Sequence, residues 1–150
     1  MSFLPFALDL SGRRIVCIGG GRVGTRRAIS FADAGAEVTV ISPEITDQLA
    51  ADDRITVRLR EFAAGDLAGA DLAHTATGVD EVDAAVVTEA TAQRVWCVDA
   101  SNAGRATAHV LVRRVVGDLT VAVHANGDPR RSRAVADSLV ATLTDSPHQA

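Results

Sequence analysis

A glycine-rich turn between a strand-like and a helix-like segment constrains the fold of this chain more than any other feature. Residues 14–18 (Arg-Ile-Val-Cys-Ile) form a short apolar run typical of a buried β-strand, and glycines follow it immediately. From residue 23 to 32, apolar and small side chains recur at helical spacing. The turn between the two segments contains Gly19, Gly21 and Gly24 in the pattern G-x-G-x-x-G.

Each glycine of such a turn has a physical task where a dinucleotide binds. The first allows a tight turn, the second lets the backbone approach a pyrophosphate, and the third lets the helix pack closely on the strand. The phosphates then lie at the helix N-terminus, where free N–H groups and the helix dipole favour anions. The motif therefore predicts dinucleotide binding. The alternative is a glycine turn that serves only to pack the strand on the helix.

Strand and helix patterns continue to alternate through the first hundred residues. Strand-like runs cover residues 37–41, 55–59, 72–75 and 95–98, and residues 81–93 have helical character. Parallel neighbours in a sheet need crossover connections, which the helices supply. This alternation predicts an α/β fold, a Rossmann-type doubly wound parallel sheet.

The end of the second predicted strand departs from the usual dinucleotide site. An acidic residue about 20 positions beyond the glycine motif usually binds the ribose hydroxyls. Here Ile41 is followed by Ser42 and Pro43, with Glu44 just beyond. Ser42 could bind a ribose hydroxyl, or it could be the N-cap of a short helix that Pro43 and Glu44 open. No arginine follows at once to bind a 2′-phosphate, so NAD is favoured over NADP.

The last third of the chain has a different pattern. Strand-like runs at residues 108–112 and 119–124 flank a Gly-Asp turn and predict a hairpin. Asp128-Pro129 then opens a predicted helix over residues 130–143. A hairpin and one helix are too small to stand alone, so a second copy of the chain is the economical partner.

These patterns divide the chain into a cofactor-binding domain, residues 1–101, and a hairpin-plus-helix dimerisation segment, residues 102–150. The composition narrows the class further. A net charge of −4 argues against a nucleic-acid partner, and no apolar run approaches the ~20 residues of a membrane span. Cys17 and Cys97 lie in apolar runs without metal-ligand spacing. They indicate a reduced, cytoplasmic protein without a metal site.

Several segments together resemble the precorrin-2 dehydrogenases, the N-terminal modules of siroheme synthases, many of which are also sirohydrochlorin ferrochelatases. The resemblance covers nearly the whole chain and rests on residues 3–10, 16–27, 34–44, 74–77, 96–101, 119–123 and 126–130. It implies a Rossmann domain in which NAD accepts a hydride from precorrin-2, giving sirohydrochlorin. It also implies a second segment that forms a homodimer and part of the tetrapyrrole cleft. The cofactor contacts that it implies are Gly21, Arg22, Val23, Pro43 and Glu44, with Thr77 near the nicotinamide.

The chain departs from this family at one position. The family has an acidic residue just after the fifth strand, and a gapless match places Ser101 there. The nearest carboxylate is Asp99, two residues earlier and on the same face of an extended segment. Asp99 is therefore our candidate base; the alternative is a strand-end carboxylate that holds a turn. Ser101 either contacts the substrate or keeps a residual catalytic role, or it is a turn residue.

Three arginines, Arg130, Arg131 and Arg133, begin the last predicted helix. Exposed cations beside a positive helix end cost about 0.3–1 kcal/mol each. They could bind the acetate and propionate groups of a tetrapyrrole, because arginine binds carboxylates in a bidentate way. The alternative is a solvated helix face.

Two functions of different classes follow. The first is NAD-dependent dehydrogenation of precorrin-2, with iron insertion as a possible second activity. The alternative is a non-catalytic module on the same scaffold that senses a tetrapyrrole or NAD, which the loss of the family acid would suit. A third reading, an NAD-binding regulatory domain of the kind that gates channels, is disfavoured because its usual acidic ribose ligand is absent.

Overall fold

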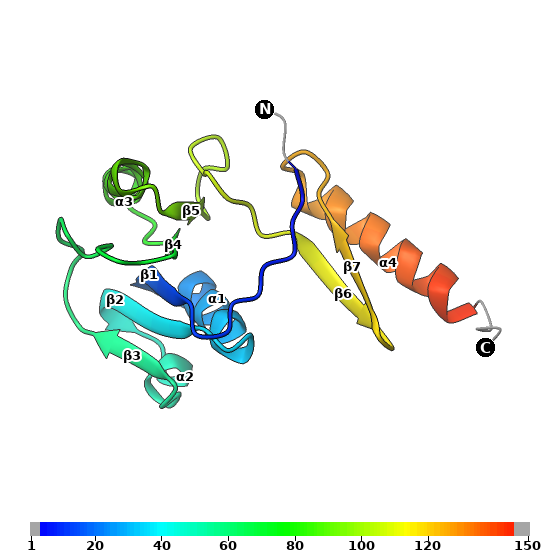
Figure 1. Ribbon diagram of the computed structural model, residues 1–150, viewed down its shortest axis with the longest axis horizontal. Helices are drawn as coiled ribbons and strands as arrows, with labels where there is room; N and C mark the ends of the chain where they lie inside the picture. The colour runs from blue at the N-terminus through cyan, green and yellow to red at the C-terminus, as the bar shows by residue number, and fades with distance from the viewer. Residues whose placement is uncertain (1–3, 146–150) are drawn as a thin grey trace. The chain divides into compact units, whose positions relative to one another are not determined.

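The computed structural model describes residues 4–145, which form two compact units (Figure 1). The first unit extends to Ala108 and the second begins at His109. This boundary falls seven residues beyond the expected one at residue 101. The reason is that the N–H groups of Thr107 and Ala108 both donate to the carbonyl oxygen of Cys97, at 2.9 and 3.0 Å, and so keep this loop with the first unit.

The first unit is built on a five-stranded parallel sheet in the order β3-β2-β1-β4-β5. The strands are β1 (Arg14–Gly20), β2 (Glu37–Ile45), β3 (Ile55–Arg58), β4 (Leu72–Thr75) and β5 (Trp96–Asp99). The helices are α1 (Arg22–Asp33), α2 (Asp47–Ala50) and α3 (Asp80–Gln93). The chain starts in the middle of the sheet, builds outward to β3 and then crosses to β4. The predicted doubly wound parallel sheet is confirmed.

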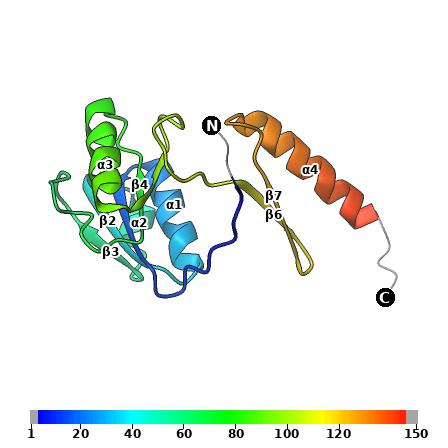
Figure 2. The same cartoon turned by 45° about the horizontal axis from the view of Figure 1, so that its top comes forward.

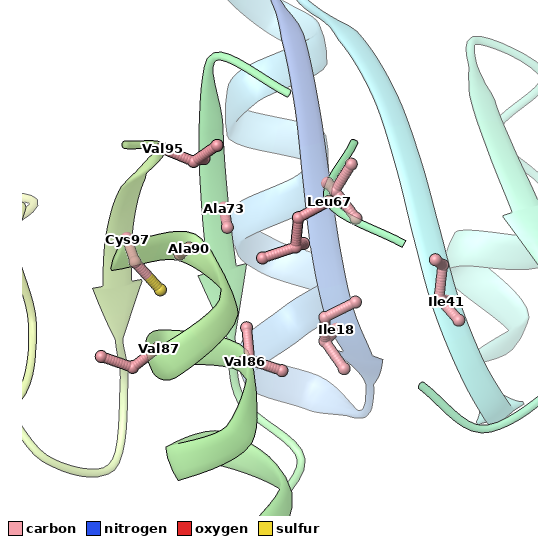
Figure 3. Close-up of a cluster of buried hydrophobic side chains, with 10 residues drawn as sticks. Ile18, Ile41, Leu67, Ala73, Val86, Val87, Ala90, Val95 and Cys97 are labelled. Atoms are coloured by element: carbon pink, nitrogen blue, oxygen red, sulfur yellow. The ribbon is translucent and has the colours of Figure 1, made fainter. Parts of the chain in front are cut away.

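Both faces of the sheet are covered, because side chains alternate between faces along each strand. Val16 and Ile18 of β1 belong to the buried cluster on the face that α3 covers with Val86 and Ala90. Figure 3 shows Ile18, Val86 and Ala90 in this cluster. Their neighbours in β1 point to the other face, where α1 contributes Phe31. Figure 2 shows the two helices on opposite sides of the sheet. Burial on both faces explains why this strand reads as a continuous apolar run.

The predicted short helix at Ser42–Glu44 is wrong, because these residues belong to β2. Ile18 pairs with Ile41, but the next pair is Gly20 with Ile45, so three residues of β2 bulge beside the end of β1. A bulge tolerates Pro43 because it needs no ladder N–H there. The helix that follows, α2, begins at Asp47, with Thr46 as its N-cap.

The second unit is an antiparallel hairpin with one helix packed along it (Figure 1). Its elements are β6 (Val112–Val116), β7 (Leu119–Val123) and α4 (Pro129–Asp145). The predicted hairpin and its turn are confirmed, with Gly117 at φ +59°. The first strand begins four residues later than predicted, because the two-residue turn pairs Val116 with Leu119 and so fixes the register.

Asp128 caps α4 as the sequence predicts. Its carboxylate accepts hydrogen bonds from the N–H groups of Arg130 and Arg131, both at 2.9 Å. Within residues 4–145, none of the helices is long and apolar enough to cross a membrane.

Candidate cofactor-binding site

The glycine motif forms the sharp turn from β1 into α1, and two of its glycines are required by close backbone contacts. Gly19 has φ +101°, and a Cβ there would lie 2.5 Å from the carbonyl oxygen of Ala76. A Cβ on Gly24 would overlap the carbonyl oxygen of Gly19. The first glycine therefore permits the turn and its approach to the segment after β4, and the third lets α1 close on β1.

The second glycine of the motif has a different environment. Gly21 is the N-cap of α1, and a Cβ there would meet no atom within 4 Å. It supplies no capping side chain, and the first turn of α1 contains no acidic residue. The first N–H groups of a helix have no partner within it, and those of Arg22 and Val23 directly follow this open position. This is the arrangement that accepts a diphosphate.

A fourth glycine, Gly20, was not identified as functional from the motif. A Cβ there would lie 2.6 Å from Cγ2 of Ile45 and 2.7 Å from the carbonyl oxygen of Glu44. Gly20 thus lets the bulged end of β2 close onto the glycine turn. The Thr25 hydroxyl holds this closure, because it donates to the carbonyl oxygen of Gly20 at 3.1 Å and lies 2.8 Å from the hydroxyl of Thr46.

A cavity of about 750 Å³ opens at the carboxyl ends of β1, β2 and β4. The chain builds β2 on one side of β1 and β4 on the other, so the cavity lies at the point where the strand order reverses. Doubly wound folds bind their ligands at this point. Of the predicted cofactor residues, six line it: Gly19, Gly21, Ser42, Pro43, Glu44 and Thr77. Arg22, Val23 and Gly24 form the adjacent first turn of α1.

Ser42 has a local partner in this arrangement. It is buried, and its hydroxyl donates to the main-chain oxygen of Glu44 at 2.6 Å. It therefore stabilises the bulge of β2 and does not cap a helix. The lining residues that were not identified from the sequence include Glu61 and Phe62 after β3, and Glu81 and Val82 in α3. No local motif marks them, since the fold brings them to the cavity from elsewhere in the chain.

A buried carboxylate holds the segment after β4 in place. Asp83, in the first turn of α3, is fully buried, and its Oδ1 accepts hydrogen bonds from the Thr75 hydroxyl and from both the N–H (3.1 Å) and the hydroxyl (2.8 Å) of Thr77. Thr77 is the residue expected near the nicotinamide. The sequence shows Asp83 only as one of three acids that open a helix, so its role was missed.

The candidate base Asp99 is buried and held by four donors. Its Oδ1 accepts from the N–H and hydroxyl of Ser101 (2.8 and 2.7 Å) and from the N–H of Asn102 (2.9 Å). Its Oδ2 accepts from Nε of Arg105 at 2.9 Å. Burial raises the pKa of Asp99, but these hydrogen bonds outweigh it and hold the pKa below its ordinary value. This geometry favours the turn-holding role over that of a base.

The network continues to the start of α3. Arg105, which the sequence analysis did not identify, forms a second ion pair with Asp80 at 2.9 Å. The Ser101 hydroxyl also accepts from this guanidinium at 3.3 Å, and Ser101 itself is exposed. The loop after β5 is thereby tied to the first turn of the helix that follows β4.

The described residues include three histidines. Burial lowers the pKa of His74 to about 4, helped by the positive charge of Arg27, so the imidazole is neutral and packs against Phe31. His109 and His124 lie just outside the hairpin strands, not within them as predicted, and their rings meet edge to face at 5.4 Å. Within residues 4–145, no group of three or more histidine, cysteine, aspartate or glutamate side chains is placed to hold a metal ion.

The three arginines at the start of α4 are exposed. Exposure is expected both for binding of substrate carboxylates and for a solvated helix face. They belong to the second unit, whereas the cavity is formed entirely by the first.

Known proteins are similar to this chain over most of its length. The siroheme synthase of Ectopseudomonas mendocina (strain ymp) is 39% identical over 133 residues, which are 85% of this chain and 28% of that protein. That of Pseudomonas putida (strain W619) is 34% identical over 134 residues, again 85% of this chain and 28% of that protein. The chain therefore spans little more than a quarter of the length of these relatives.

A solved structure matches the fold. SirC, a precorrin-2 dehydrogenase, superposes with a TM-score of 0.81 at 21% identity, covering 93% of this chain and 71% of that one. The family model NAD_binding_7, described as "Putative NAD(P)-binding", matches residues 6–111. This match covers the glycine turn, the cavity and the whole parallel sheet. The chain belongs to this NAD(P)-binding family, and its similarity to siroheme synthases confirms the resemblance found in the sequence.

Proposed function

We propose that this chain is an NAD-dependent dehydrogenase that converts precorrin-2 to sirohydrochlorin. The observation that carries the proposal is the open N-terminus of α1 at Gly21, beside a 750 Å³ cavity, in a chain similar to siroheme synthases. A cavity of this size lies within the range of about 300–1,000 Å³ typical of small-molecule sites.

The residues present fit a dinucleotide. The N–H groups at the start of α1 would hold the diphosphate, and the bulged end of β2 would lie along the adenosine half. The Thr77 segment, fixed by Asp83, would lie along the nicotinamide half. When bound, NAD accepts a hydride, and the substrate loses that hydride and one proton. The chain's own task is to hold the nicotinamide ring and the reacting carbon in register.

We assign Asp99 to holding the loop after β5 and not to taking the proton. A carboxylate that accepts four hydrogen bonds and has a lowered pKa is a weak base. Ser101 is exposed, so we assign it as a residue of this loop that contacts the substrate. We assign Arg130, Arg131 and Arg133 to the acidic side chains of the tetrapyrrole.

We also propose that the second unit forms a homodimer. Four apolar side chains of the hairpin and α4 are between 39% and 57% exposed: Val115, Leu119, Val135 and Leu139. A two-stranded hairpin with one helix does not bury enough apolar surface to be stable by itself. A second copy of the same unit would cover these side chains.

The test is to incubate the purified chain with precorrin-2 and NAD and to follow the absorbance of sirohydrochlorin and NADH together. We expect both products in equal amounts. NAD binding without turnover would contradict the dehydrogenase and favour the sensing module, which is consistent with Ser101 in place of the family acid. Absence of NAD binding would contradict both.

A further inference from the structure

Three glutamates line the cavity, and none of its described lining residues is cationic. They are Glu44, Glu61 and Glu81. Among residues 4–145, none of the three takes part in an ion pair. The arginines next to the lining residues in the sequence, Arg22 at the start of α1 and Arg60 beside Glu61, are not themselves lining residues. The described lining residues therefore carry three carboxylates and no cation.

The sheet order separates these glutamates into two groups. Glu44 is in the bulge of β2 and Glu61 lies three residues after β3, so both are on the β2–β3 side of the glycine turn. Glu81 is in α3, which follows β4 on the opposite side. In a doubly wound fold the diphosphate lies at the first turn, and the adenosine ribose lies at the end of the second strand. The pair Glu44 and Glu61 thus belongs to the adenosine side.

The end of the second strand usually supplies the acidic residue that binds the ribose, but in this chain Ile41 and Ser42 stand there. Ile41, at the end of the regular part of β2, is fully buried. The hydroxyl of Ser42 already donates its proton to the main chain. An acidic partner for the ribose must therefore come from the bulge or from outside β2.

Glu61 is held in a fixed turn. The guanidinium of Arg60 donates to the main-chain oxygen of Glu61 at 2.9 Å and to both carboxylate oxygens of Asp66 at 2.6 and 2.7 Å. Asp66 in turn accepts from the N–H of Ala63 at 2.8 Å. These bonds close the segment after β3 into one turn and pair the guanidinium of Arg60 with Asp66. The main chain of Glu61 is thereby held in this turn, and none of the ion pairs among residues 4–145 includes its carboxylate.

We propose that Glu61, together with Glu44, binds the adenosine ribose hydroxyls of NAD and excludes the 2′-phosphate of NADP. A carboxylate accepts hydrogen bonds from ribose hydroxyls. A phosphate monoester carries about −1.5 to −2 charge at neutral pH, so the same carboxylates repel it. The inference rests on the proposed function only for dinucleotide binding and does not depend on the tetrapyrrole.

The experiment is calorimetric titration of the full chain with NAD and with NADP, for the wild type and for single variants. We expect the wild type to bind NAD at least tenfold more tightly. Glu61→Gln removes the charge at nearly constant shape, so we expect weaker NAD binding, stronger NADP binding and a ratio reduced about tenfold. Glu44→Gln should act in the same direction. Melting temperatures of the free variants verify that each is folded.

Two controls separate position from charge. Glu37→Gln changes the same charge at the exposed start of β2, at the opposite end of the strand from the cavity, and should leave both dissociation constants unchanged. Glu81→Gln changes a lining residue on the other side and should alter NAD and NADP binding in equal proportion. An unchanged ratio in Glu61→Gln, or equal binding of NAD and NADP by the wild type, would overturn the inference while leaving dinucleotide binding intact. If the wild type bound neither nucleotide, the proposed function would fail as well.

Discussion

At the scale of single residues, the glycines of the turn separate folding from ligand binding. Gly24 is required by the backbone, because any side chain there meets the carbonyl oxygen of Gly19. Gly21 is not required in this way, since its surroundings are open and its φ of −71° suits any residue. The second and third glycines of the motif should therefore respond differently to the same substitution.

We expect Gly21→Ala to weaken NAD binding at least tenfold with a loss of stability of no more than about 1 kcal/mol, the cost of alanine at an N-cap. The added methyl group occupies the space that the diphosphate would enter. Gly24→Ala should lower the melting temperature strongly, because the backbone must shift. Thermal unfolding and calorimetry on both variants measure this contrast. Equal stability loss in the two variants, with equal NAD binding, would contradict it.

At the scale of elements, the chain fixes the loops at the carboxyl ends of β4 and β5 with buried carboxylates. Asp83 holds the loop after β4 from the first turn of α3, and Asp99 holds the loop after β5. Arg105 connects the second loop to Asp80 at the start of α3. The segments after β4 and β5 are thus braced by hydrogen bonds to carboxylates, which are stronger than neutral ones.

The pKa of Asp99 leads to a pH dependence. Because this pKa is lower in the folded chain than the ordinary value of 3.8, the carboxylate stabilises the fold fully above about pH 4. This stabilisation is lost as the pH falls through the lower pKa of the folded state. Asp99→Asn should therefore be less stable than the wild type at pH 7 by about 1.5–3 kcal/mol, the contribution of a hydrogen bond to a charged group. The difference should shrink towards pH 3.

Urea unfolding of both proteins at a series of pH values measures this difference. A constant difference from pH 7 to pH 3 would show that the Asp99 charge does not contribute. In the same variant, turnover that falls in step with stability would support the positioning role. Loss of turnover in a variant that is as stable as the wild type would instead support a base.

At the scale of the whole molecule, the chain consists of a unit that encloses its own core and a unit that does not. The first unit buries two apolar clusters, one on each face of its sheet. The second leaves apolar side chains of its hairpin and helix exposed, Val115 among them at 57%. This contrast is the physical basis for the proposed dimer.

We expect Val115→Glu to convert the chain from a dimer to a monomer at micromolar concentration, because a charge would be placed in the dimer contact. Analytical ultracentrifugation measures the change. The matched control is Leu59→Glu, which introduces the same charge at a 68% exposed apolar residue of the first unit and should leave the dimer intact. A wild-type monomer, or a dimer that survives Val115→Glu, would contradict the proposal.

The sequence by itself determined the elements whose signal is local. The strand, glycine turn and helix over residues 14–33 follow from periodicity and from backbone requirements that neighbouring residues set. The alternation of strands and helices likewise determined the parallel sheet, since crossovers leave few other topologies. The hairpin turn was also local, but the register of β6 depended on pairing across it.

Only the tertiary structure decided what depends on contacts between distant segments. The bulge of β2 exists because Gly20 allows Ile45 to pair beside the turn, and this pairing outweighs the helix-start pattern of Ser42–Glu44. Glu61 reaches the cavity and Asp83 reaches Thr77 only once the sheet has formed. A local pattern reports the conformation of a few neighbouring residues. The partners of a side chain are set by the fold that brings distant segments together.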